Sequence, residues 1–157
     1  MKPSFLNDQG QSILKAALFA AVINGAINGV IQLFLLRAHT PLMLTVDGIT
    51  NDAHTVFGTA VTLAAVLAMI LTVVGHVTLK GPKRRFWPHG LLLTLWHGLL
   101  AFGAVVSAAV LWQRFAGSVE VSLLTASAMI GLIAALVAGV ITYRTNMASR
   151  LQPVPAQ

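Results

Sequence analysis

The side chains best placed to do chemistry inside an apolar stretch of this sequence are three amides. Asn24, Asn28 and Gln32 follow one another at four-residue intervals in an otherwise apolar run. A four-residue step advances about 400° around an α-helix, so the three amides share one face. Gly25 and Gly29 form the neighbouring row, about 100° away. The run therefore combines a row of polar groups with a row of residues that lack a side chain.

Two interpretations of the amide row remain open. As fasteners, the amides would hydrogen-bond across to neighbouring helices and stabilise the packing by about 0.6–2 kcal/mol each. As a lining, they would form a polar path within one chain or between copies, because polar groups at mid-membrane are candidates for functional sites. Three amides in a row are more polarity than one fastening requires, and the two interpretations are compatible.

Histidines form the second group. The stretch HGLLLTLWHGLL places His89 and His97 on roughly the same helix face, and His76 lies near the end of the preceding apolar run. Histidines on neighbouring helices at one depth can ligate haem axially or hold a metal, which makes His76 and His97 candidate ligands. Alternatively, the histidines bond backbone carbonyls or interfacial water. We predict that no haem or other cofactor is bound.

The loop RAHTPLMLTVDGITNDAHT, after the first apolar run, holds the third group. Asp47, Asn51, Asp52 and His54 offer oxygen and nitrogen ligands for a divalent cation. The alternative is a purely structural role, with Asp47-Gly48 in a turn and Asn51 or Asp52 as the N-cap of the next helix. The apolar stretch PLMLTV before these residues predicts a short segment that lies on the membrane surface or is tucked into the bundle.

The elements that position these residues follow from composition. Only 9% of the 157 residues are charged and 57% are hydrophobic, whereas soluble domains carry about 25% charged residues. Four apolar runs without Asp, Glu, Lys or Arg are each long enough to cross a hydrocarbon core of about 30 Å. We therefore predict an all-α integral membrane protein, a bundle of four transmembrane helices.

The predicted spans are residues 16–36, 55–79, 90–112 and 121–143, all within one transmembrane domain over residues 16–144. Residues 1–15 are predicted to form a short segment outside the membrane. The tail, residues 145–157, contains two prolines, which cannot continue a helix, and is predicted to be disordered.

All four runs carry small residues at four-residue intervals. In lipid, helices associate through close backbone approach, which small residues permit, so these rows predict tightly packed faces. The rows are Ala17, Ala21, Gly25 and Gly29 in the first run, Ala60, Ala64 and Ala68 in the second, Gly103 and Ser107 in the third, and Ser127, Gly131, Ala135 and Gly139 in the fourth.

The charges predict the orientation. Short loops rich in Lys and Arg stay in the cytoplasm, so both termini and the loop at residues 80–89 are predicted to lie on the cytoplasmic side of an inner or plasma membrane. The net charge of +6 is therefore a topology signal, and no nucleic-acid partner is expected. Eight of the ten basic residues fall on this side: Lys2, Lys15, Lys80, Lys83, Arg84, Arg85, Arg144 and Arg150.

Several classes of function are excluded or disfavoured. The absence of cysteine excludes disulfides and thiolate metal sites. No carboxylate lies in a span, which disfavours proton-coupled exchange, and no catalytic constellation is present, so we expect no enzyme.

Two functional hypotheses remain, with a weaker third. The first is a small, permease-like, oligomeric protein that transports a solute or ion along the amide row. The second is a non-catalytic scaffold or subunit of a membrane complex. The third is a haem- or quinone-binding subunit that uses His76 and His97. The expected partners are the lipid bilayer and either further copies of the chain or another membrane protein.

The predicted topology can be tested with single cysteines, because the chain has none of its own. Cysteines introduced at Gly81 and Gly117 should differ in their reaction with a membrane-impermeant thiol reagent on intact cells. Only the Gly117→Cys protein should be labelled, and both proteins should be labelled after the cells are permeabilised. Labelling of Gly81→Cys alone in intact cells would invert the orientation.

Overall fold

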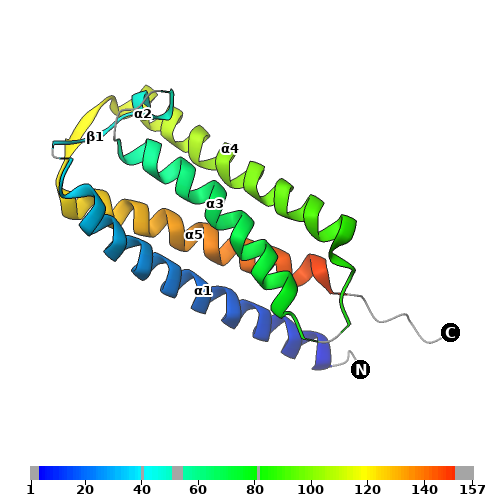
Figure 1. Cartoon of the computed structure of the whole chain (residues 1–157). Helices are drawn as coiled ribbons and strands as arrows, with labels where there is room; N and C mark the ends of the chain where they lie inside the picture. The colour runs from blue at the N-terminus through cyan, green and yellow to red at the C-terminus, as the bar shows by residue number, and fades with distance from the viewer. Residues whose placement is uncertain (1–3, 40, 51–54, 81, 151–157) are drawn as a thin grey trace.

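Four long helices dominate the computed structural model, which describes residues 4–39, 41–50, 55–80 and 82–150 (Figure 1). All four are long and apolar enough to cross a membrane, which confirms the predicted helical class and the number of apolar helices. The long helices are α1 (Ser4–Leu36), α3 (Val56–Thr78), α4 (Leu91–Ala116) and α5 (Leu123–Ser149), and the shorter elements are β1 (Leu42–Leu44), α2 (Asp47–Thr50), a turn of π-helix named η1 (Phe86–Gly90), and β2 (Val119–Val121).

Two of the long helices extend well beyond the predicted spans. Helix α1 begins at Ser4, so the described part of the segment 1–15 is helical. Helix α5 continues to Ser149, and the prediction of disorder is wrong for residues 145–149. Thr145 and Ser149 are fully buried against the other helices. This packing stabilises the helix beyond Arg144, the charged residue that follows the predicted span. Residues 151–157 lie outside the described residues.

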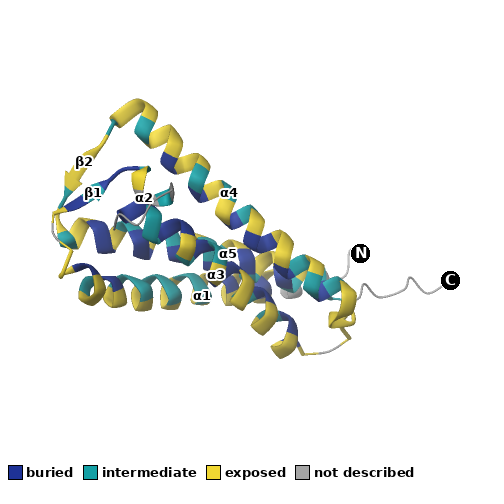
Figure 2. Cartoon of the chain, turned by 45° about the horizontal axis from the view of Figure 1, so that its top comes forward, coloured by how far each residue is buried: buried dark blue, intermediate teal, exposed yellow. Residues whose placement is uncertain are grey.

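The helices pack in the spatial order α1, α5, α3, α4. Helix α1 lies along α5, α5 packs against α3, and α3 packs against α4, whereas α4 and α5 make little contact. The two central helices are the most covered (Figure 2). In the apolar windows, 44% of the residues of α5 and 39% of those of α3 are buried, against 6% for α1. Helix α1 is therefore attached to the rest of the molecule mainly through one neighbour.

Small side chains build the core around the two central helices. Their fully buried positions include alanines at intervals of four or eight residues, which bring helix backbones close together. These are Ala60, Ala64 and Ala68 of α3, the row predicted for the second span, and Ala126, Ala134 and Ala138 of α5.

The α1–α5 contact brings together the two predicted rows that contain paired glycines. A Cβ atom placed on Gly131 would lie 2.9 Å from the carbonyl oxygen of Gly25 and 3.1 Å from Cα of Gly29. A Cβ atom placed on Gly25 would lie 2.8 Å from Cβ of Ala135. Further along, Gly139 faces Ala21 in the same way. The backbones of α1 and α5 thus touch directly where these glycines cross.

One end of the molecule, here called the strand end, is closed by β1 and β2. The strands are antiparallel, with Leu42 opposite Val121 and Leu44 opposite Val119. Leu42 and Leu44 are each only 1% exposed, so the apolar stretch predicted to lie on the membrane or tuck into the bundle is a buried strand.

Helix α3 begins at a different cap from the predicted one. The side chain of Thr55 accepts a hydrogen bond from the backbone N–H of Gly58 at 3.1 Å, which makes Thr55 the N-cap. The expectation that Asn51 or Asp52 would cap this helix is therefore wrong. Threonine competes well for this position because its hydroxyl reaches the same N–H groups. Asp47, expected in a turn with Gly48, begins the short helix α2.

The glycine crossing predicts opposite effects for two Gly→Ala substitutions. In a helix, alanine is favoured over glycine by about 1 kcal/mol, and at Gly103 an added Cβ would meet nothing within 4 Å. We expect Gly103→Ala to be neutral or stabilising. Gly131→Ala must push the backbones of α1 and α5 apart, and we expect a net loss of about 1–3 kcal/mol.

Thermal or denaturant unfolding in a neutral detergent measures both variants against the unmodified chain. Equal stability of the Gly131→Ala and Gly103→Ala proteins would show that the close crossing is not required.

Candidate functional site

The amide row of α1 bonds within its own helix. Nδ2 of Asn24 donates to the carbonyl oxygen of Ala20 at 2.8 Å, and Nδ2 of Asn28 donates to that of Asn24, also at 2.8 Å. Both side chains are half-buried. Within the described part of the chain, no hydrogen bond joins these amides to another helix. Among the described residues of a single copy, the amides therefore do not fasten α1 to another helix, which was one of the two interpretations of the row.

The last amide of the row is left with an unmet acceptor. Gln32 is 5% exposed, and its Oε1 is buried without a hydrogen-bond partner. A buried polar atom with no partner costs about 1–3 kcal/mol. A water molecule enclosed beside this oxygen that donated to it would recover that free energy.

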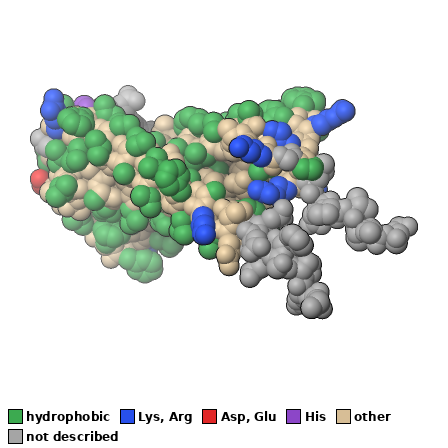
Figure 3. All heavy atoms as spheres, turned by 90° about the horizontal axis from the view of Figure 1, so that it is seen from below, with side chains coloured by type: hydrophobic (Ala, Val, Ile, Leu, Met, Phe, Trp, Pro, Cys, Tyr) green, Lys and Arg blue, Asp and Glu red, His purple; other side chains and the backbone are tan. Residues whose placement is uncertain are grey.

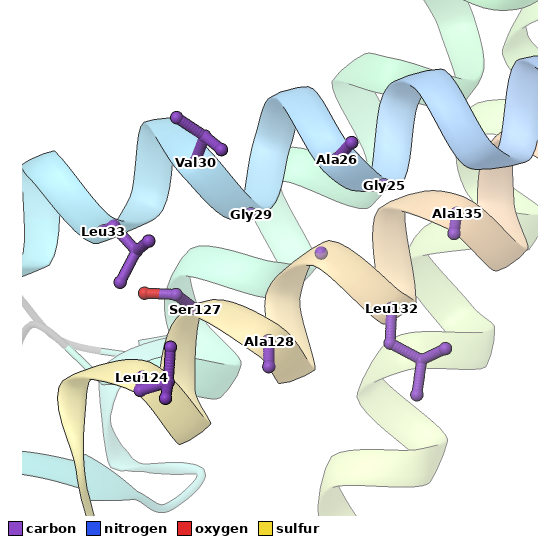
Figure 4. A pocket seen from close by; sticks show the side chains of 11 residues that line it. Gly25, Ala26, Gly29, Val30, Leu33, Leu124, Ser127, Ala128, Leu132 and Ala135 are labelled. Carbon is purple, nitrogen blue, oxygen red and sulfur yellow. The ribbon is translucent and has the colours of Figure 1, made fainter.

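A groove runs between α1 and α5 on the other flank of the glycine row (Figure 4). It has a volume of about 400 Å³, and Ala26, Val30 and Leu33 line it on the α1 side. Ala26 and Val30 follow the two glycines in sequence, whereas Asn24 and Asn28 precede them. On a helix these positions lie on opposite flanks, so the amides do not line this groove.

Two further grooves lie beside α5. One, of about 340 Å³, continues along α1 and α5 past Leu18 to Tyr143. The other, of about 290 Å³, lies where α4 and α5 are only loosely in contact, and its lining includes Leu100 of α4 and Val140 of α5. The linings of all three grooves are apolar apart from Ser127 and Tyr143. Their chemistry suits acyl chains or apolar side chains and offers no polar passage.

A buried hydrogen bond between Thr72 and His97 joins α3 to α4. The hydroxyl of Thr72 donates its proton to the carbonyl oxygen of Ala68 at 2.7 Å. We assign its second contact, 2.9 Å to Nδ1 of His97, as a bond that the hydroxyl accepts, because its one proton is directed to Ala68. His97, which is 1% exposed, then carries its proton on Nδ1 and keeps a lone pair on Nε2.

His76 joins α3 to α5 in a similar way. Its Nδ1 lies 3.0 Å from Oγ of Ser149, and its ring packs edge-on against Phe86 with centroids 5.3 Å apart. Thr72 and His76 are one turn apart on α3, so this helix is tied to both of its neighbours from one face. His89, the third histidine of this region, bonds the carbonyl oxygen of Ala148 through Nε2 at 3.3 Å.

The hydrogen bonds of His76 and His97 decide which of their ring nitrogens could ligate a haem iron or a metal. His76 and His97 each use Nδ1 within the protein, so Nε2 would be the ligand atom for a haem iron or a metal. A ligating histidine usually has its other nitrogen hydrogen-bonded in this way. Among the described residues there is no cluster of three or more His, Asp or Glu side chains that could hold a metal ion.

Only Asp47 of the proposed cation site lies within the described residues, and Asn51, Asp52 and His54 lie outside them. Asp47 Oδ2 accepts a bond from the hydroxyl of Thr45 at 3.0 Å. That hydroxyl accepts one from Ser118 at 3.2 Å, and Ser118 accepts one from Nε2 of Gln113 at 3.0 Å. A chain of hydrogen bonds therefore runs from α4 to a carboxylate on α2 and holds the strand end together.

Thr72 and Ser149, the hydroxyl partners of the histidines, are not among the residues that the sequence singles out. Thr72 could have been found, because it precedes His76 by four residues and so shares its helix face. No local pattern marks Ser149, which is 73 positions away from His76.

Comparisons with protein-family models, with characterised proteins and with solved structures found no match for this chain.

The Thr72–His97 bond predicts that replacing the hydroxyl of Thr72 by a methyl group strongly lowers the free energy of unfolding. Thr72→Val keeps the shape of the side chain and leaves the Nδ1–H of His97 buried without an acceptor. We expect a loss of about 1–3 kcal/mol in the free energy of unfolding, measured in detergent. Thr78→Val is the matched control, because Thr78 makes the same bond within its helix, 2.7 Å to the carbonyl oxygen of Val74, but is exposed.

A double-mutant cycle with His97→Leu separates the bond from other effects of the substitution, and contacting pairs couple by about 0.5–3 kcal/mol. Equal losses in Thr72→Val and Thr78→Val, with no coupling, would contradict the assigned bond.

Proposed function

We propose that this chain is a non-catalytic, multi-pass membrane protein. It assembles laterally through the face of α1 that carries Asn24, Asn28 and Gln32, here called the amide flank. The occupant of that flank is a transmembrane helix of a second copy or of a partner subunit. The observation that carries the proposal is the pair of half-buried amides, Asn24 and Asn28, which among the described residues bond only within α1, the least covered of the four long helices.

The position of α1 supports this assembly. It is the least covered of the four long helices, and Asn24 and Asn28 each keep an oxygen acceptor beyond the bonds made within the helix. Polar groups that meet only hydrocarbon are costly. An amide flank therefore gains free energy by facing another polar helix surface, whereas the apolar groove on the opposite flank is compatible with lipid.

The distribution of charge supports an orientation with both termini and residues 80–89 in the cytoplasm. Figure 3 shows most Lys and Arg side chains gathered at the end of the molecule away from the strand end. The acidic residue Glu120 lies in β2, at the strand end. Retention of the basic end in the cytoplasm follows from the positive-inside rule.

A second candidate is permeation of a small solute or ion between copies, and the length of the amide row favours it. Three amides on one flank would form a polar seam wherever two such flanks face each other. Because the grooves of the single chain are apolar, this path would lie between chains. The haem or quinone alternative remains a further prediction, and a Soret band in the purified protein would support it.

The assembly proposal predicts a specific effect of removing the amides. The double substitution Asn24→Leu and Asn28→Leu should lower the assembled fraction in crosslinking and detergent sizing while the chain still folds, because only bonds within its own helix are lost. Asn146→Leu is the matched control. Asn146 is also half-buried and donates to its own helix, 2.8 Å to the carbonyl oxygen of Thr142, but lies on α5.

Assembly of the double variant equal to that of the unmodified chain would refute the amide flank as an interface. Flux into liposomes then separates the two candidates. A scaffold should show none, and a permeation protein should lose its flux in Asn28→Leu and retain it in Asn146→Leu.

A further inference from the structure

The loop between α3 and α4 is tied to the ends of two helices. The backbone N–H of Arg84 donates to the carbonyl oxygen of Ser149 at 3.0 Å, and Lys83 pairs with Arg150 in an isolated antiparallel bridge. Nζ of Lys83 also donates to the carbonyl oxygens of Val77 at 2.7 Å and of His76 at 3.2 Å. The loop is thus held against the C-terminal ends of both α3 and α5.

The partial negative charges at these two helix ends balance only part of the positive charge of the loop and of Arg150. The last carbonyl groups of a helix have no partner within it and carry a partial negative charge, which a nearby cation stabilises. Lys83 does this for α3. Three arginines accompany Lys83 in this part of the chain: Arg84 and Arg85, which follow it in sequence and have exposed side chains, and Arg150, whose backbone pairs with that of Lys83.

The guanidinium group of Arg150 has no hydrogen-bond or ion-pair partner among the described residues. Its Nε is buried and has no hydrogen-bond partner, although a guanidinium group remains charged and its N–H groups are strong donors. The carboxylates of Asp47 and Glu120 belong to α2 and β2, at the strand end. Among the carboxylates whose side chains the structure describes, none is therefore close enough to pair with Arg150.

The surroundings identify the class of anion. Trp87 follows this basic group in sequence and is 71% exposed, and exposed tryptophans prefer the level of the lipid headgroups. At that level the abundant anion is the phosphate of an acidic lipid. Guanidinium groups bind phosphate oxygens in a forked geometry that a lysine cannot offer.

We propose that Arg84, Arg85 and Arg150 bind the headgroup phosphate of an anionic membrane lipid, and we call these three residues the arginine site. The site lies on a different element from the amide flank and does not depend on assembly through α1. The headgroup phosphate offsets the positive charge of these arginines and fastens the ends of α3 and α5 to the headgroup layer.

The test uses the full chain purified in a neutral detergent. Phosphatidylglycerol, phosphatidylcholine or inorganic phosphate is added, and lipid retention is followed by native mass spectrometry together with thermal unfolding. The double variant Arg84→Gln with Arg150→Gln is compared with Arg37→Gln and Arg114→Gln, which removes the same charge at the strand end. Two lost guanidinium charges should weaken phosphatidylglycerol retention about 30-fold, and the control should retain it as the unmodified chain does.

Three outcomes would overturn the proposal. They are equal weakening in the control, equal retention of phosphatidylcholine, and stabilisation by inorganic phosphate as large as that by phosphatidylglycerol, which would indicate a site for a free anion. If the double variant does not fold, Arg85→Gln decides, because no contact of its exposed side chain supports the fold. A fall of about fivefold in retention supports the site, and no fall refutes it.

Discussion

The direct contact of helix backbones determines how this chain is put together. When glycine and alanine occupy the facing positions of two helices, the helices approach until their peptide groups touch, and dispersion then acts over long stretches of backbone. The crossing of Gly25 and Gly131 is the closest example, and the buried alanines of α3 and α5 extend the same principle through the core. The order α1, α5, α3, α4 follows from which rows meet.

Polar bonds add specificity to this packing. A row of small residues tolerates sliding by one turn, because the next small residue replaces the last, but the Thr72–His97 and His76–Ser149 bonds each fit only one register. In an apolar environment a mismatched histidine would be left without a partner, at a cost of about 1–3 kcal/mol. The two pairs therefore select one register of α4 and one of α5 along the axis of α3.

The sequence allows the helices to be predicted but not their partners. Four apolar runs of sufficient length admit few structures other than helices, and spacing identifies the tightly packed faces. Any small-residue row can meet any other, however, so the pairing of α1 with α5 could not be derived. The same holds for Ser149, whose partner lies on another helix, and for the strand Leu42–Leu44, which is too short to show a pattern. The cap at Thr55 was missed because nearby Asn and Asp residues are equally suitable in type.

The attachment of α1 has a consequence for biosynthesis. Its one extensive partner, α5, is the last of the four helices to leave the ribosome, and the other two are made in between. At typical rates of elongation, α1 waits on the order of ten seconds before α5 emerges. Until then, α1 lacks the contact with α5 that covers one side of it. Closing the contact then joins the two ends of the domain, so α1 and α5 complete the molecule in a single late step.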